Sequence, residues 1–317
     1  MLRKVLRWLG VVVGALALVL LLIVAVHWAP DRPVSQLEPR WAQPPSTFVE
    51  VGGMRVHVRD EGPRDDPKPI VLLHGTSASL HTWEGWARAL RDKRRVIRFD
   101  LPGFALTGPS PDGRYDIESY VRFTRAMLDR LAVRRCVLAG NSLGGKIAWE
   151  TALADAGRVE ALVLVDAGGY PMESQSMPIG FRLAKTPVVN RLTSLVLPRS
   201  IIVSSLRDVY GDPTKVTPEL IDLYFDMAIR EGNRRALVAR FAQTQHGAGS
   251  ERIAQLKIPT LVMWGGRDRL LPPAHGERFH REVAGSKLVI FDDLGHVPHE
   301  EDPARTVAAV QGFLGGT

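Results

Sequence analysis

The chain has 317 residues, which is enough for one large α/β domain with an insertion or for two smaller domains. Its hydrophobic content of 45% and charged content of 24% are ordinary for a globular protein, and its single cysteine, Cys136, excludes an internal disulfide framework. The net charge of +7 comes from scattered arginines without a basic stripe, so we expect no nucleic-acid partner. The sequence has no phosphate-binding glycine motif and no clustered His or Cys spacing, so we also expect no cofactor and no metal.

The N-terminal segment predicts a membrane anchor. Residues 9–26 form an uncharged run of about eighteen residues, roughly the length that a helix needs to cross a bilayer. Three basic residues precede this run, so the positive-inside rule predicts a cytoplasmic N-terminus and an extracytoplasmic catalytic domain. The alternative is a cleaved signal peptide, which would leave the protein secreted. We expect a single-pass signal anchor at 1–29 and an extended tether, rich in proline and charge, at 30–46.

Beyond the tether, short apolar runs predict a mostly parallel sheet flanked by helices. Residues 48–51 and 54–58 alternate between apolar and polar around Gly52-Gly53, a pattern typical of a hairpin. The following apolar runs are continuous, as in strands that are buried on both faces. We expect these strands at 70–73, 96–99, 136–139, 161–165, 260–264 and 288–291, with an amphipathic helix at 117–131.

The alternation of strands and helices stops between residues 166 and 253. Residues 170–246 contain proline-bounded, helix-like segments such as 219–230 but no clear strand. About eighty residues are too many for a connecting loop. We therefore predict a helical cap at 169–249, inserted into an α/β core formed by 47–168 and 250–317. Most apolar residues of the cap are expected to form its own core, and a minority to line a substrate pocket: Met172, Met177, Phe181, Leu195, Leu197, Ile201, Ile202, Tyr224, Phe225 and Phe241.

The stretch Gly140-Asn141-Ser142-Leu143-Gly144 lies between a predicted strand and a predicted helix. A G-x-S-x-G pattern in this context is typical of a nucleophile elbow, a tight turn in which the serine backbone is strained. A Cβ atom at Gly140 or Gly144 would collide with the neighbouring strand or helix. The pattern therefore predicts that the hydroxyl of Ser142 lies at a helix N-terminus, where backbone N–H groups favour negative charge.

Further polar residues follow the other predicted strands. His74-Gly75-Thr76, Asp100, Asp268 and His296 each come directly after one, and ligands of open parallel sheets bind at the carboxyl ends of the strands. With Ser142, these motifs resemble those of the α/β-hydrolase superfamily, serine hydrolase branch. The resemblance covers the chain from residue 48 onward except the cap. A weaker likeness, based on the anchor, is to membrane-anchored monoacylglycerol-lipase-like hydrolases.

The resemblance implies a Ser-His-Asp triad. Ser142 would be the nucleophile, His296 the base that removes its proton, and Asp268 the carboxylate that orients the imidazole. Two alternatives stay open. His299 lies three residues beyond His296 and could serve as the base, and Asp166 ends the strand at 161–165 and could serve as the acid.

The resemblance also implies an oxyanion hole formed by the backbone N–H groups of Thr76 and Leu143. His74, next to Gly75, would support this loop by hydrogen bonding without transferring protons. The loop at 102–108 departs from the family, because Ala105 stands where a second glycine is usual. The other histidines belong to no constellation and are interpreted as surface or packing residues: His57, His81, His246, His275 and His280.

A serine at the elbow argues against epoxide hydrolases and haloalkane dehalogenases, which carry aspartate there. We expect hydrolysis of carboxylic esters, including lipidic ones, through an acyl-serine intermediate. One alternative is a carbon–carbon bond hydrolase of ring-cleavage products, whose elbow is similar to Gly140-Asn141-Ser142-Leu143-Gly144-Gly145. Another is a non-catalytic module that uses the hydrolase fold to bind a ligand.

Overall fold

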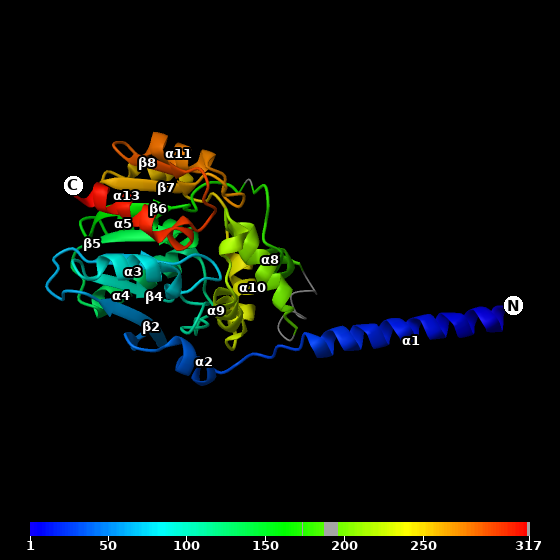
Figure 1. Ribbon diagram of the computed structural model, residues 1–317. Helices are drawn as coiled ribbons and strands as arrows, with labels where there is room; N and C mark the ends of the chain where they lie inside the picture. Colours follow the sequence, from blue (N-terminus) through cyan, green and yellow to red (C-terminus); the bar gives the residue numbers. More distant parts are fainter. Residues whose placement is uncertain (173, 187–195, 316–317) are drawn as a thin grey trace.

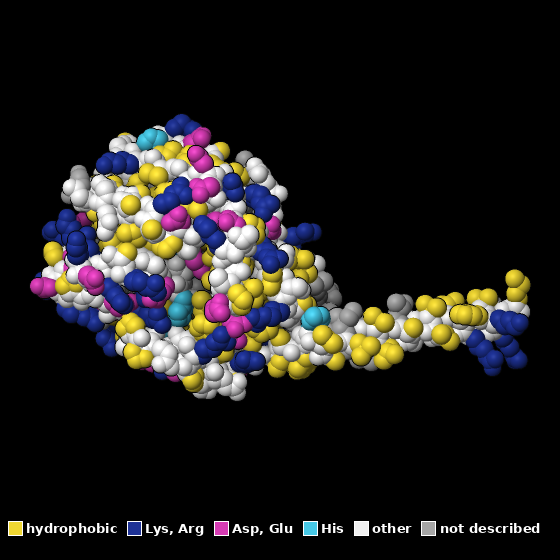
Figure 2. Space-filling view, in the orientation of Figure 1, with side chains coloured by type: hydrophobic (Ala, Val, Ile, Leu, Met, Phe, Trp, Pro, Cys, Tyr) yellow, Lys and Arg dark blue, Asp and Glu magenta, His cyan; other side chains and the backbone are white. Residues whose placement is uncertain are grey.

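The computed structural model describes residues 1–172, 174–186 and 196–315. A central sheet lies between helices, further helices gather at one side of it, and α1 (Leu2–Val26) extends away from this body (Figure 1). On the face shown in Figure 2, basic and acidic side chains are interspersed over the body, while basic side chains gather at the N-terminal end of α1.

The sheet has eight strands in the order β1-β2-β4-β3-β5-β6-β7-β8. The hairpin of β1 and β2 is antiparallel, β2 pairs antiparallel with β4, and every other pair is parallel. The mostly parallel sheet is thereby confirmed. The strands are β1 (Ser46–Val51), β2 (Met54–Glu61), β3 (Ile70–Leu73), β4 (Val96–Phe99), β5 (Cys136–Asn141), β6 (Val159–Val165), β7 (Thr260–Gly265) and β8 (Lys287–Phe291).

The central strands are mostly apolar because they are covered on both faces; in β4 the buried Arg98 pairs with Glu61 at 2.7 Å and with Glu84 at 2.8 Å. In β3, all four side chains are buried: Val71 and Leu73 belong to one apolar cluster, and Ile70 and Leu72 belong to the cluster on the other side of the sheet. This is the burial that a continuous apolar run predicts for a strand inside a parallel sheet. It holds the carboxyl ends of the strands rigidly enough to position side chains of the loops that follow.

The helices of the core cover both faces of the sheet (Figure 1). In α4, Asp116 caps the helix by accepting a hydrogen bond from the backbone N–H of Ser119, and the apolar face predicted at 117–131 is buried. These helices are the short 3-10 helix η1 (Leu80–Trp83), α3 (Glu84–Leu90), α4 (Ile117–Arg130), α5 (Leu143–Ala154), α11 (Ala274–Glu282), α12 (Pro298–Glu301) and α13 (Pro303–Leu314).

Between β6 and β7, the described part of the chain contains helices and no strand of the sheet. They are α6 (Ile179–Lys185), α8 (Arg199–Val209), η2 (Pro213–Lys215), α9 (Pro218–Ile229), α10 (Asn233–Gln243) and η3 (Ser250–Gln255). Leu195, one of the apolar residues expected in the cap, lies outside the described residues. Hereafter we call this insertion the cap; its boundaries at 169 and 249 stay a prediction.

The prediction of a transmembrane helix is wrong. Within the residues that the structure describes, no helix is both long enough and apolar enough to cross a bilayer. The helix α1 forms and begins at Leu2, so that Arg3, Lys4 and Arg7 lie in its first two turns. The signal anchor at 1–29, the membrane partner and the extracytoplasmic placement of the catalytic domain all depended on that span and are corrected with it.

The segment at 30–46 also differs from the extended tether that its composition predicts. It contains α2 (Val34–Trp41), whose Leu37 is only 2% exposed. Ahead of α2, the carboxylate of Asp31 pairs with the guanidinium of Arg234 in the cap at 2.6 Å. The charges that suggest a solvated linker are therefore paired, and one buried leucine fixes the segment to the core.

Candidate active site

Ser142 lies at the turn between β5 and α5, with φ 53° and ψ −112°. A positive φ is costly for a residue with a side chain and persists only where the surroundings enforce it. Close packing enforces it here: a Cβ atom on Gly140 would lie 2.2 Å from the carbonyl oxygen of Gly144, and one on Gly144 would lie 2.2 Å from that of Leu73. Strand and helix therefore approach at distances that only glycine allows, and the serine occupies the apex of the turn.

Asp268 and His296 are in direct contact beside this turn. The Asp268 Oδ2 atom lies 2.6 Å from the His296 Nδ1 atom, and both side chains are buried. The Asp268 Oδ1 atom accepts hydrogen bonds from the backbone N–H groups of Leu270 and Leu271 at 2.8 and 2.9 Å, which fixes the carboxylate. Nε2 is therefore the ring nitrogen of His296 that Asp268 does not contact.

Ser142 and His296 line the same cavity, but no hydrogen bond joins the Ser142 hydroxyl to the imidazole in the described structure. In enzymes without substrate, catalytic hydrogen bonds are often long and tighten when the substrate binds. The arrangement therefore brings the three predicted residues to one site, with the acid and the base already paired.

Asn141 links the elbow to the loop that carries His296 by a hydrogen bond, and the sequence did not predict this role. Its amide Nδ2 donates to the carbonyl oxygens of His296 at 2.9 Å and of Val165 at 3.2 Å. A Cβ atom on Gly75 would lie 2.7 Å from the Asn141 Oδ1 atom, so the oxyanion loop also passes directly over this amide. The only signal in the sequence was its position, as the variable residue before the serine of the elbow.

The two predicted oxyanion donors line one cavity with Ser142. Thr76 follows β3, and Leu143 is the first residue of α5. His74 braces the Thr76 loop: its Nδ1–H group donates to the carbonyl oxygen of Gly75 at 2.7 Å, and its Nε2 atom accepts from the backbone N–H of Leu101 at 2.9 Å. Burial lowers the pKa of His74, in keeping with this neutral, bridging ring.

Asp166, the alternative acid, makes no hydrogen bond to the imidazole of His296 in the described structure. Its Oδ1 atom accepts a hydrogen bond from the backbone N–H of Gly265 at 3.0 Å, and its carboxyl group also shares a hydrogen bond with Asp268. Burial and the negative charge of Asp268 raise the pKa of Asp166 well above its usual value. Ligand atoms of Asp166, Asp268 and His296 lie within 4.8 Å of one another, close enough for a metal ion. Because Asp268 and His296 are already hydrogen-bonded to each other, we interpret the three residues as a proton-transfer site and not as a metal site.

His299, the alternative base, is separated from Ser142. Its Nε2 atom lies 2.9 Å from the Thr82 hydroxyl, and its ring packs on Trp83 with 4.0 Å between the ring centroids. It lines neither of the two cavities that contain Ser142. Burial lowers the pKa of His299 well below its usual value, as expected for a packed, neutral ring.

His57, interpreted from the sequence as a packing residue, pairs with the loop aspartate Asp100. The His57 Nδ1 and Asp100 Oδ2 atoms are 2.8 Å apart and fully buried. The backbone N–H groups of Leu80 and Leu106 donate to the same carboxylate at 2.7 and 3.1 Å. Burial alone would raise the pKa of Asp100, but the charge and hydrogen bond of His57 lower it to about 2. The pair thus fixes the loop that follows β4 under the active site.

This pair predicts a stability change at low pH. Because the carboxyl pKa in the folded protein lies below the value of about 4 in the unfolded chain, the stabilisation is present above that pH and is lost as the pH falls toward 2. We expect Asp100→Asn to lower the free energy of unfolding by about 2.5 kcal/mol near neutral pH and to flatten its decline in acid, measured by urea unfolding. Asp65→Asn, at an exposed carboxylate, is the matched control. An unchanged acid profile in Asp100→Asn would contradict the assignment.

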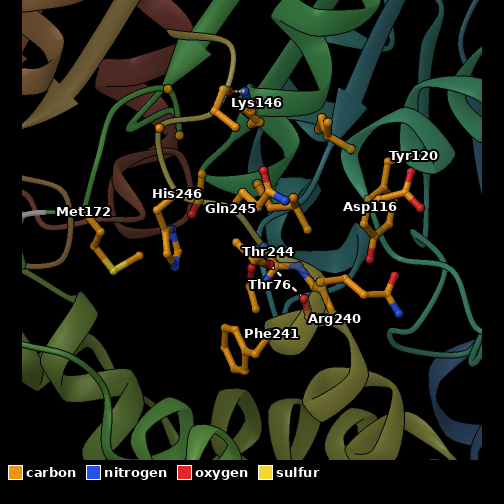
Figure 3. A pocket seen from close by; sticks show the side chains of 18 of the residues that line it. Thr76, Asp116, Tyr120, Lys146, Met172, Arg240, Phe241, Thr244, Gln245 and His246 are labelled. Atoms are coloured by element: carbon orange, nitrogen blue, oxygen red, sulfur yellow. Dashed lines mark hydrogen bonds between the residues drawn. The ribbon is translucent and has the colours of Figure 1, made fainter.

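Two cavities of different character meet at Ser142 and Thr76. The smaller, of about 160 Å³, is largely apolar and includes His296. The larger, of about 370 Å³, carries several charged side chains, some of which are labelled in Figure 3. Apolar side chains of the smaller cavity come from α6 and α8: Leu183, Ala184, Ile201, Ile202, Leu206 and Val209. Charged or basic side chains of the larger one are Asp116, Glu118, Lys146, Glu150, Lys185, Arg240, His246 and Arg252.

The class of this protein is defined by its fold, by the elbow at Ser142 and by the hydrogen-bonded pair of Asp268 and His296. A family model described as alpha/beta hydrolase fold matches residues 68–303, most of the chain. The chain therefore belongs to the alpha/beta hydrolase family, and it is a hydrolase. The family expected from the motifs is thereby confirmed.

Individual relatives divide between two chemistries. A 2-hydroxy-6-oxo-2,4-heptadienoate hydrolase from Pseudomonas putida is 26% identical over 277 residues, which cover 84% of this chain and 95% of that protein. The solved structure of a meta-cleavage product hydrolase from Pseudomonas fluorescens IP01 has a TM-score of 0.74 at 24% identity, over 85% of this chain and 97% of its own. A membrane phospholipase A, described as a bacterial virulence factor, has a TM-score of 0.72 at 26% identity, over 99% of this chain and 97% of its own.

Proposed function

We propose that this chain is a serine-nucleophile hydrolase that cleaves a carbon–carbon bond next to a carbonyl group, in a substrate of the ring-cleavage-product type. The observation that carries the proposal is that an apolar cavity and a charged cavity, which contains Lys185, Arg240 and His246, both include Ser142. A 2-hydroxy-6-oxo-dienoate has the same division, because a ketone with an apolar substituent stands at one end and a carboxylate at the other. The similarity to the Pseudomonas putida hydrolase, which is named for such a compound, supports this choice.

In this proposal, His296 removes the proton from Ser142, and the serine oxygen adds to the substrate ketone. The backbone N–H groups of Thr76 and Leu143 stabilise the oxyanion that forms. The substrate reacts as its 2-oxo tautomer, in which the hydroxyl proton has moved to the carbon next to the ketone. The carbon–carbon bond then breaks, its electron pair is delocalised into the 2-oxo-enone as a dienolate, and the dienolate oxygen takes up the proton from His296. Water, deprotonated by His296, releases the acyl group from the serine as a carboxylic acid. Asp268 orients the imidazole throughout.

Hydrolysis of carboxylic esters, the reaction expected from the sequence, is the second candidate. The same nucleophile, base and oxyanion donors serve when an alkoxide leaves in place of a carbon. The specific observation in its favour is the likeness to the membrane phospholipase A, which extends over 99% of this chain. The apolar cavity beside His296 would then hold the acyl group of the ester.

A comparison of substrates tests the proposal. We expect measurable kcat/KM for 2-hydroxy-6-oxohepta-2,4-dienoate or its 6-phenyl analogue, followed by loss of the dienolate absorbance. p-Nitrophenyl esters of graded acyl length should be at least about a hundredfold poorer substrates. Only the dienoate has a carboxylate that can bind the basic side chains of the larger cavity. Faster turnover of the esters would replace the proposal by the second candidate. A folded protein that turns over neither class would favour the ligand-binding module instead.

A further inference from the structure

The basic end of the larger cavity contains a buried arginine without a carboxylate partner. Arg240, on α10, is 7% exposed, and its Nε atom is buried with no hydrogen-bond partner. Among the described residues the guanidinium makes no ion pair with a carboxylate. It shares a hydrogen bond with the Tyr120 hydroxyl and lies 5.4 Å from the ring centroid of Phe241. Burying a charge costs free energy unless an opposite charge compensates it. Arg240 therefore places an uncompensated positive charge inside the cavity.

Two further basic groups face the same place. Lys185 ends α6, and its Nζ atom lies 4.9 Å from the ring centroid of Phe241, the neighbour of Arg240. His246 follows α10 and lines the same cavity (Figure 3). Burial and the charge of Arg240 lower the pKa of Lys185, and burial with the charges of Lys185 and Arg240 lowers that of His246. We call Lys185, Arg240 and His246 the basic cluster. Its members repel one another, and among the described residues neither Lys185 nor His246 forms an ion pair.

The other two cations of the cavity differ in this respect. The Lys146 ammonium lies 2.8 Å from Glu150, and the guanidinium of Arg252 lies 2.6 Å from the second oxygen of the same carboxylate. Glu150 therefore balances the positive charge at that wall of the cavity. Asp116 and Glu118 also line the cavity, and Asp116 pairs with Arg114 at 3.3 Å. Among the described residues no carboxylate forms an ion pair with the basic cluster, so its excess positive charge is directed at whatever occupies the cavity.

We propose that the basic cluster binds a carboxylate group of the substrate whose reacting carbonyl lies at Ser142. The proposal rests on the proposed function for the position of that carbonyl. Ser142, Arg240, Lys185 and His246 all line one continuous cavity, so a single molecule can reach from the nucleophile to the cluster. A planar guanidinium can donate two parallel hydrogen bonds to a carboxylate, which makes Arg240 the principal contact and Lys185 and His246 auxiliary ones.

Binding of a matched pair of small dienes to the full-length Ser142→Ala protein tests the site without requiring turnover. The pair is sorbate, a six-carbon dienoate, and sorbamide, its neutral amide, each titrated by calorimetry. We expect sorbate to bind at least about tenfold more tightly than sorbamide, since one charge-assisted hydrogen bond accounts for a factor of that size. Adding Arg240→Gln should remove this preference, and Arg240→Lys, which keeps the charge, should retain part of it.

Arg235→Gln is the matched control, because Arg235 lies on the same helix, is exposed and does not line the cavity. It should leave the preference for sorbate unchanged. Equal binding of sorbate and sorbamide to the parent protein would overturn the proposal. A preference that survives Arg240→Gln in a protein with an unaltered circular dichroism spectrum would overturn it equally.

The outcome is separable from that of the proposed function. Charge-selective binding that depends on Arg240, in a protein that does not hydrolyse dienoate ketones, would retain the carboxylate site and reject the assigned bond cleavage. Hydrolysis of dienoate ketones by a protein that binds sorbate and sorbamide equally would retain the reaction and reject the site.

Discussion

Replacing Ser142 by alanine is expected to lower kcat by about a millionfold, because the variant lacks the atom that forms the covalent bond to the substrate. The strained turn keeps its backbone, since the packing at Gly140 and Gly144 does not involve the hydroxyl. The variant should therefore fold like the parent protein. Loss of turnover of the dienolate substrate and loss of labelling by a fluorophosphonate probe are the two measurements.

Ser205→Ala provides the control for this experiment. Ser205 lines the apolar cavity next to Ser142, and its hydroxyl accepts a hydrogen bond from the backbone N–H of Gly180 at 3.3 Å. Its loss should leave fluorophosphonate labelling intact and change kcat by less than about tenfold, since it contacts no reacting atom in the proposed mechanism. Persistent labelling of Ser142→Ala would show that another residue is the nucleophile.

The sheet could be predicted because its signals are local. Apolar runs predicted β3 and β4 residue for residue, since a strand covered on both faces admits few polar side chains, of which Arg98 in β4 is one. The end of β5 was not predicted: this strand continues through Gly140 and Asn141, where apolar character has already stopped. Pairing with β6 determines that end, and such pairing is not visible in a single run.

The elbow and the residues around it could be predicted from motifs, because each lies on a loop directly after a strand. The ties between these loops could not. Asn141 contacts His296 across 155 residues of sequence, and His57 contacts Asp100 across 43. Such contacts depend on which strands are neighbours in the sheet, so a sequence pattern gives no direct signal for them.

The N-terminal region shows the opposite failure, in which a local signal misled. Residues 9–26 are uncharged, and this feature predicted a membrane span that the described structure contradicts. Proline and charge at 30–46 predicted an extended tether. In the structure Asp31 forms an ion pair with Arg234 of the cap, and Leu37 is buried in the core. The basic cluster was missed for a related reason, because the sequence does not show where carboxylates lie relative to Arg240.

Asp268→Asn is the second substitution with a large expected effect. We expect kcat to fall by about ten-thousandfold, the usual size when the acid of such a triad becomes an amide. The amide oxygen can still accept the hydrogen bonds from the backbone of Leu270 and Leu271, so the loop keeps its shape. The amide NH₂ group, however, would donate to His296 Nδ1 and place the ring proton on Nε2, where the base must be unprotonated. Steady-state kinetics with the dienolate substrate measure the loss.

Asp166→Asn is the matched variant, because Asp166 is the neighbouring buried carboxyl group at the end of β6. Since Asp268 and not Asp166 makes the hydrogen bond to His296, an amide of the same shape at 166 should change kcat by less than about tenfold. An equal loss in both variants would mean that the two carboxyl groups share one proton and act on His296 as a unit. A larger loss in Asp166→Asn would transfer the role of the orienting acid to Asp166.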